Sequence, residues 1–85
     1  MRVTVRLFAR LREITGKSEL TLDLPDGYDA RALWDDLAQD YPDLSPYGAS
    51  VSCAVNEQYT KFTARLEDGD EVAFLPPVSG GSRRE

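Results

Sequence analysis

The sequence contains no histidine and only one cysteine among its 85 residues. Histidine is the commonest general base and metal ligand in proteins, so its absence argues against most hydrolytic, nucleophilic and metal-dependent mechanisms. The spaced motifs of zinc proteases, P-loop nucleotide-binding proteins, dinucleotide-binding domains and serine hydrolases are also missing. We therefore expect a protein that is not itself an enzyme and that holds neither a metal nor a bound cofactor.

Positive charge is scarce, with 10 Lys and Arg against 15 Asp and Glu and a formal net charge of −5. Proteins that bind nucleic acid or anionic membranes need clustered basic residues to neutralise phosphates, so neither partner is expected and a basic protein partner fits better. No apolar run approaches the length of a membrane span, and the first residues do not form a signal peptide. These features predict a cytoplasmic protein.

The composition is that of one globular domain, with 41% hydrophobic and 29% charged residues. A chain of this length has room for one modest core and no second folded unit. We expect the folded domain to span residues 1–78. The remaining residues, 79–85, are rich in glycine and serine and are expected to form a flexible tail.

Two alternating patterns in the first third of the chain predict strands. Residues 2–9 alternate between apolar and polar side chains, which is the period of a half-buried strand. Leu20, Leu22 and Leu24 form a second such pattern, and the two strands are expected to pair in antiparallel fashion. Between them, the spacing of apolar residues and a glycine at position 16 predict one short helical turn.

The central segment, residues 30–41, has the helical spacing of apolar residues. Asp29 is expected to cap its first turn, and Pro42 is expected to end it. One side of this helix should pack on a sheet, with Trp34 in the core. Residues 42–50 contain two prolines and a glycine and are expected to form a surface loop.

The last part of the chain predicts three more strands. Residues 51–55 alternate and place Cys53 inward, where it should act as a small core hydrophobe. Residues 59–66 are irregular and are expected to contain a short strand. The acidic residues 67–70 are expected to form a solvated turn, and the alternative is that they and Glu71 steer a basic partner. Residues 71–75 alternate again before Pro76 and Pro77 end the sheet.

The order strand, strand, helix, strand, short strand, strand predicts an α+β fold of the ubiquitin-like β-grasp type, with a mixed sheet and one main helix packed on one face. In this arrangement Val72 and Phe74 point into the core. Phe8 and Leu75 are expected to be exposed on the opposite face of two adjacent strands. A shared apolar patch on a sheet face is typical of a docking surface.

Three segments resemble one family of sulfur carriers. They are AVNE at residues 54–57, LEDGDEVAFLPPVSGG at 66–81 and LFARLRE at 7–13. Together they resemble the small subunit of molybdopterin synthase over essentially residues 1–81. A lone Gly-Gly is a weak signal, but the acidic turn, the apolar strand and PPVxGG in succession are specific. The related carriers of the thiamine pathway are shorter between the helix and the third strand.

The resemblance implies that Gly80 and Gly81 form the functional terminus. A ubiquitin-activating-type enzyme would adenylate the Gly81 carboxylate with ATP, and the adenylate would become a thiocarboxylate. The thiocarboxylate would then deliver sulfur in the active site of the large subunit of molybdopterin synthase. Because glycine lacks a Cβ atom, a Gly-Gly terminus can enter a narrow channel. Residues expected to dock on these partners are Phe8, Tyr59, Leu75, Pro76 and Pro77.

The chain departs from the family pattern after Gly81, because Ser82, Arg83, Arg84 and Glu85 follow. These residues would block adenylation of Gly81. Either a peptidase removes them from a precursor, or they are an addition to the natural sequence.

Three other functions stay open at this stage. The same chemistry could serve thiamine, an amino acid, tRNA thiolation or a secondary metabolite. The chain could also be a ubiquitin-like modifier joined to lysines through Gly81. The simplest alternative is a β-grasp interaction module whose tail is inert.

Overall fold

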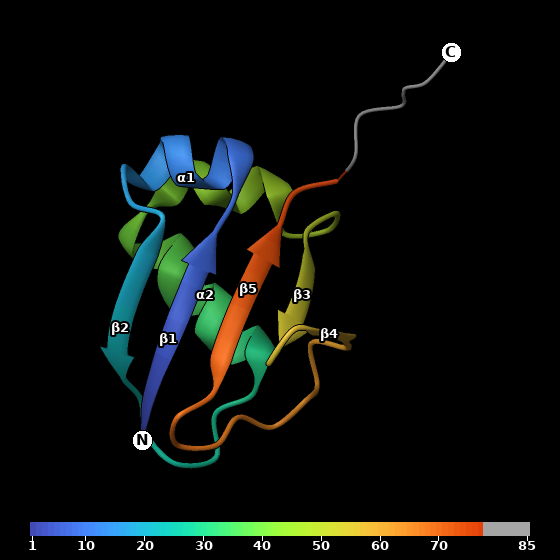
Figure 1. Ribbon diagram of the computed structural model, residues 1–85. Coiled ribbons are helices and arrows are strands. Elements are labelled where there is room, and N and C mark those ends of the chain that lie inside the picture. Colours follow the sequence, from blue (N-terminus) through green and yellow to red (C-terminus); the bar gives the residue numbers. More distant parts are fainter. Residues whose placement is uncertain (78–85) are drawn as a thin grey trace.

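The computed structural model describes residues 1–77, which form one mixed sheet with helices packed against it (Figure 1). The strands are β1 (Arg2–Leu7), β2 (Glu19–Asp23), β3 (Ser52–Val55), β4 (Gln58–Thr60) and β5 (Glu71–Leu75), and the helices are α1 (Ala9–Thr15), α2 (Ala30–Asp40) and the 3-10 helix η1 (Pro42–Tyr47). Within this part of the chain, no helix is long and apolar enough to cross a membrane.

The last strand lies in the middle of the sheet. The strand order is β2-β1-β5-β3-β4, and β5 pairs in parallel with β1 while the other neighbours are antiparallel. The sequence order of the elements and this mixed pairing confirm the β-grasp prediction. Figure 1 shows the arrows of β1 and β5 pointing the same way, so the two strands end at the same edge of the sheet.

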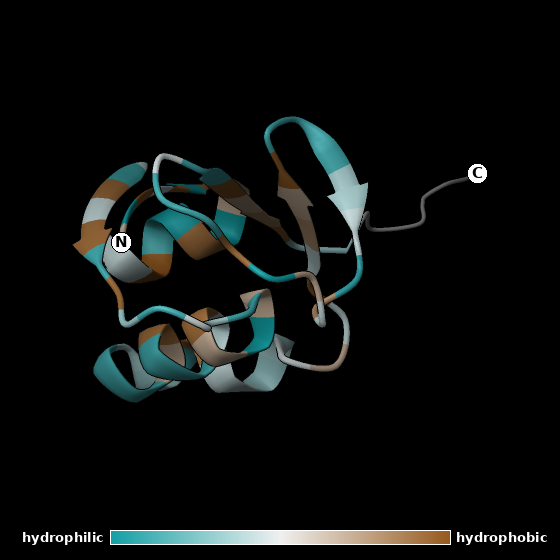
Figure 2. Cartoon of the chain, turned by 90° about the horizontal axis from the view of Figure 1, so that it is seen from below, coloured by the Kyte–Doolittle hydropathy of each residue, from teal (hydrophilic) through white to brown (hydrophobic). Residues whose placement is uncertain are grey.

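One face of the sheet packs on α2 to form the core, and Figure 2 shows the sheet and this helix as two layers. The alternating side chains expected to be buried are buried, including Val72 and Phe74 with no exposed surface. Cys53 and Trp34 are also in the core, as expected. Further core residues are Val3, Val5, Leu7, Leu11, Leu24, Ala30, Leu33, Leu37, Leu44, Val51 and Leu66.

Helix α2 begins where the sequence predicts. The Asp29 carboxylate accepts a hydrogen bond of 2.8 Å from the Ala32 amide, which satisfies one of the free donors of the first turn. The amides of Ala30 and Arg31 donate to carbonyls of the segment that follows β4, at Ala64 and Phe62. This irregular segment therefore closes the N-terminus of the helix against the sheet.

Three aromatic side chains join the helix to the sheet. The rings of Trp34 and Phe74 meet edge to face with centroids 5.1 Å apart, and Phe62 stacks on Phe74 at 6.2 Å. The guanidinium of Arg31 lies 4.7 Å above the Phe62 ring. Phe62 thus anchors the segment after β4, as its apolar character suggests.

Two expectations about local structure are wrong. The first strand ends at Leu7 and not at residue 9, because Ala9 has a φ of +52° and turns the chain into α1. The segment expected to be a surface loop contains η1, whose Leu44 is completely buried. The prolines and the glycine around Leu44 interrupt the helical spacing of apolar residues. The sequence pattern therefore does not reveal that Leu44 is buried.

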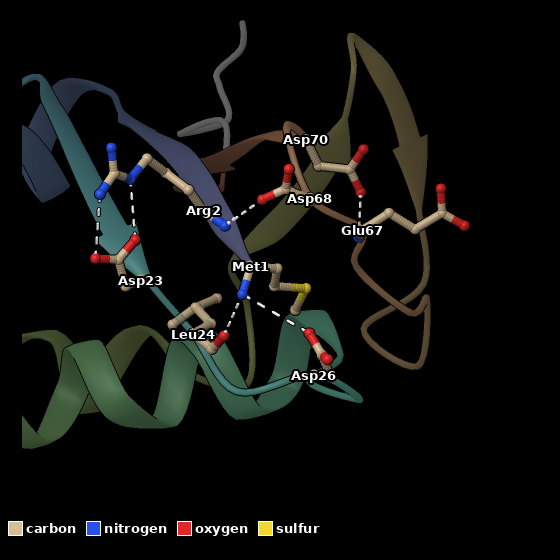
Figure 3. A network of polar contacts seen from close by, with 8 residues as sticks. All are labelled: Met1, Arg2, Asp23, Leu24, Asp26, Glu67, Asp68 and Asp70. Carbon is tan, nitrogen blue, oxygen red and sulfur yellow. Dashed lines mark hydrogen bonds and ion pairs between the residues drawn. The ribbon is translucent and has the colours of Figure 1, made fainter.

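The acidic turn before β5 is not merely a solvated loop, because hydrogen bonds connect it to the start of β1. Figure 3 shows the backbone amide of Arg2 donating to the Asp68 carboxylate, at 2.7 Å. The Gly69 amide donates to the Arg2 carbonyl at 2.8 Å, and Gly69 has a φ of +89° that favours glycine. In the same view Asp70 accepts from the Glu67 amide. These bonds fix the start of β5 beside the start of β1.

The facing of β5 gives a first prediction. Phe74→Ala should lower the free energy of unfolding by about 3–5 kcal/mol, because it removes a fully buried ring from the aromatic cluster. Leu75→Ala, one residue along on the other face, should cost about 1 kcal/mol or less. Urea denaturation followed by far-UV circular dichroism measures both. Equal losses at the two positions would contradict the facing of the strand.

The helix cap gives a second prediction. Asp29→Ala should lower the free energy of unfolding by about 1 kcal/mol, because the Ala32 amide loses its acceptor. Asp35→Ala is the matched control, since it removes an exposed carboxylate from the same helix and should change stability by less than about 0.5 kcal/mol. If Asp35→Ala were the more damaging of the two, the cap would not have the role assigned to it.

Candidate functional site

The outer face of the sheet, opposite α2, has a shallow groove with a volume of about 290 Å³. Three of the residues expected to dock partners line it, namely Phe8, Tyr59 and Leu75. The remaining lining residues are Arg6, Ala54, Glu57, Glu71 and Ala73. Residues distant in the sequence thus meet at one surface, which we call the outer groove.

Strand register explains why the outer groove forms where it does. Arg6 is opposite Ala73, Ala73 is opposite Ala54, and Ala54 is opposite Tyr59. These four residues form one row across four strands. The two alanines in the middle have short side chains, so the surface is lower at the centre of the row than at Arg6 and Tyr59.

The three expected docking residues differ in exposure. Tyr59 is 73% exposed and Phe8 is 39% exposed. Leu75 was expected to be exposed but is half-buried, because it lies in the wall of the groove. Ala54 is buried although it belongs to the outer row, and it forms part of the groove floor.

The charged residues on the Arg6 side of the groove form ion pairs with one another. The Arg6 guanidinium lies 3.3 Å from the Glu71 carboxylate and 3.9 Å from that of Glu19. It also lies 5.8 Å from the centroid of the Phe8 ring, within the range of a cation–π contact. Arg6 therefore holds Phe8 at the edge of the groove.

A strained two-residue turn joins β3 and β4 at the other side of the groove. Asn56 and Glu57 have φ values of +51° and +71°, the left-handed region required at both positions of a type I′ hairpin. The Asn56 side chain donates to Asp70 at 3.0 Å and accepts from the Glu71 amide at 3.0 Å. Its own amide donates to the Glu71 carbonyl at 2.8 Å. The turn is thereby fixed to the start of β5.

Two charged residues of the groove, Arg6 and Glu57, are not among the residues that the sequence predicts for the site. A signal for Glu57 was present, because Asn followed by one more residue between two short strands is a hairpin pattern. The short residues Ala54 and Ala73 were also missed. Their place in the groove depends on which strands are neighbours in the sheet, and a local sequence pattern does not show this.

Within the described residues, no group of three or more Cys, Asp or Glu side chains is placed to hold a metal ion. Cys53 is 1% exposed, and its thiol donates to the Thr60 carbonyl at 3.5 Å. Burial raises the pKa of the Cys53 thiol, while the charge of Arg31 acts in the opposite direction. A protonated, buried thiol is a poor nucleophile.

Strand β5 ends beside the outer groove. Leu75 pairs with Ser52 in the last register position of β5, and Pro76 and Pro77 follow without regular structure. A proline has no amide hydrogen and so cannot extend the ladder. Gly80 and Gly81 lie outside the described residues, as do residues 82–85 and the expected boundary at residue 78.

Three comparisons with known proteins bear on this site. The model of the ThiS family matches residues 5–81. The molybdopterin synthase sulfur carrier subunit of Arabidopsis thaliana is 42% identical over 79 residues, which cover 93% of this chain and 82% of that protein.

Solved structures show the same fold. The crystal structure of SAMP1 from Haloferax volcanii has a TM-score of 0.82 at 27% identity, covering 95% of this chain and all of that one. A protein–protein complex of subunits 1 and 2 of the molybdopterin-converting factor from Helicobacter pylori contains a chain with a TM-score of 0.67 at 26% identity, covering 95% of this chain and all of that one.

The burial of Cys53 gives a third prediction. A thiol reagent at mildly alkaline pH should modify Cys53 in the native protein at least about 100-fold more slowly than in denaturant, because reaction requires local or global opening. Thr63→Cys places a second thiol at an exposed position and should add one fast-reacting equivalent. Stoichiometric labelling of the native parent at the unfolded rate would show that Cys53 is accessible.

Proposed function

The chain belongs to the ThiS family and is a sulfur carrier of the molybdopterin synthase type, and from this premise we propose that Gly81 is its sulfur-bearing residue and the outer groove its docking surface. The observation that supports this most directly is the end of β5. The last paired residue of that strand, Leu75, lies in the groove wall, so the segment that leads to Gly81 departs from the docking surface itself.

Chain length is consistent with this arrangement. Gly81 is the sixth residue after Leu75 in the sequence, and six residues span at most about 20–22 Å when extended. A partner docked on the groove can therefore have an active site within that distance of the groove. Pro76 and Pro77 prevent the segment from adding to the sheet, which keeps it available to the partner.

The chemistry requires a free carboxylate on Gly81. A carboxylate oxygen attacks the α-phosphorus of ATP, an acyl-adenylate forms, and pyrophosphate leaves. Hydrosulfide from a sulfur donor then attacks the acyl carbon, AMP leaves with the bonding electron pair, and a thiocarboxylate remains. The carrier supplies the acyl group, while a ubiquitin-activating-type enzyme supplies the ATP site. A step that uses ATP is consistent with the cytoplasmic location expected from the sequence.

We propose two successive partners for the same groove. The activating enzyme binds first, and the large subunit of molybdopterin synthase then accepts the sulfur. One surface can serve both, because the two enzymes bind in succession and receive the same terminus. The two-subunit complex from Helicobacter pylori supports the second of these interactions by analogy. If residues 82–85 belong to the natural chain, a peptidase that cuts after Gly81 must act before either of the others.

A second candidate function is protein modification through the same terminus. It is favoured by the similarity to SAMP1 from Haloferax volcanii, which belongs to the small archaeal modifier proteins. Both functions use an adenylated Gly81 and differ only in the attacking group, which is sulfur in one and a lysine amine in the other. Intact-mass analysis of the protein from its host distinguishes a thiocarboxylate from an isopeptide-linked adduct. Sulfur transfer for another pathway would also give a thiocarboxylate, with a different acceptor.

The terminus gives a fourth prediction. The chain that ends at Glu85 should not be adenylated, because the Gly81 carbonyl is an amide to Ser82. The chain truncated after Gly81 should support ATP–pyrophosphate exchange with the activating enzyme from the same organism. Deletion of Gly81 from the truncated chain should abolish this exchange, since it shortens the segment by one residue and removes the second glycine.

The matched control is a truncated chain with Glu67→Gln, a change in an exposed side chain of the turn before β5, at the opposite end of that strand from Leu75. It should exchange as the truncated parent does. Equal adenylation and thiolation of the chains ending at Glu85 and at Gly81 would show that no processing is needed, and the acceptor would then be another carboxylate.

A further inference from the structure

We propose that Glu57 selects partners that present a basic side chain beside the apolar group that fills the outer groove. This inference rests on the proposed docking function and adds the chemistry of the partner's surface. It concerns a residue whose backbone strain and side-chain position have no evident part in holding the fold together.

The backbone at Glu57 is strained for a residue with a side chain. Its φ of +71° is the second left-handed position of the hairpin, where glycine is the ordinary choice. Asn56, the first position, is fixed to the start of β5 by hydrogen bonds of both its backbone and its side chain. A glycine at position 57 would therefore form the same turn with less strain. The turn therefore holds the Glu57 carboxylate at the groove, although the turn would form without that side chain.

The charges around the groove leave Glu57 without a counter-ion. Among its lining residues the ionic groups are Arg6, Glu57 and Glu71. Arg6 is paired with Glu71 and also lies within reach of Glu19. Within residues 1–77, no salt bridge or side-chain hydrogen bond involves the carboxylate of Glu57. The groove lining therefore has one uncompensated negative charge.

Docking of a partner would change the free-energy cost of leaving the Glu57 carboxylate unpaired. The free groove is open to water, and an exposed carboxylate needs no partner. A protein that covers Ala54, Ala73 and Leu75 excludes water from the adjacent carboxylate as well, and an unpaired carboxylate is costly to desolvate. A partner with an Arg or Lys at this place recovers that cost, whereas one with a neutral or acidic side chain does not. The occupant is thus a protein surface with an apolar side chain flanked by a cation.

The test measures binding of the chain ending at Gly81 to the large subunit of molybdopterin synthase from the same organism. Glu57→Arg should weaken binding by about 30-fold or more, and Glu57→Gln by about 5-fold, because the first substitution replaces attraction with repulsion. Glu67→Arg is the matched control, an equal change of charge at an exposed residue outside the groove, and should change the dissociation constant by less than about twofold. Glu57→Gln should also weaken the dependence of binding on salt concentration.

A second variant separates binding from folding. Glu57→Gly removes the carboxylate and the backbone strain together, so it should raise the thermal unfolding temperature while weakening binding as Glu57→Gln does. Binding of Glu57→Arg within twofold of the parent would overturn the proposal. Equal weakening by Glu57→Arg and Glu67→Arg would also overturn it, because the effect would then be one of net charge.

The docking groove itself is tested separately by Leu75→Ala. If Leu75→Ala weakens binding and Glu57→Arg does not, the groove is the docking surface and only the basic contact is wrong. If neither substitution weakens binding while the chain ending at Gly81 is still adenylated, the proposed docking surface fails and the carrier chemistry stands.

Discussion

The parallel pairing of β1 with β5 is the constraint on which the rest of the structure depends. It inserts the last strand between β1 and β3, so that Phe74 reaches the centre of the core and contacts Trp34 of α2. The bonds from Arg2 to Asp68 and Gly69 fix the start of this pair. Because the strands are parallel, they also end together, which brings Phe8 and Leu75 to the same groove.

The outer face of the sheet has two chemically different halves. On β2 and β1, charged residues pair across strands, as in the 2.9 Å contact between Arg2 and Asp23. On β5, β3 and β4 the centre of the same face is formed by Ala73, Ala54, Leu75 and Tyr59, and the one charged residue of β5 on this face, Glu71, is paired with Arg6. A surface whose charges are already paired offers little to a partner, while a hollow apolar surface gains from being covered. The proposed docking surface is therefore the half of this face that contains Leu75, the last paired residue of β5.

A carrier of this kind separates the acyl group from the catalytic machinery. The chain has no histidine, and its one thiol is buried with a raised pKa. Its own contributions are a packed sheet and a shaped surface beside the end of β5. Such a division lets one small protein serve successive enzymes, because each partner needs only a complementary surface and an active site within reach of Gly81.

Most of the strands, the start of α2 and the carrier signature could be predicted from the sequence alone. Alternation predicted which side of β5 is buried, Asp29 predicted the start of α2, and the PPVSGG segment indicated the family. Tertiary structure alone decided the burial of Leu44, the half-burial of Leu75 and the place of Glu57 at the groove. The physical reason is that periodicity reports which face of an element is apolar, whereas a groove depends on which strands become neighbours, and neighbours are chosen by packing of the whole chain.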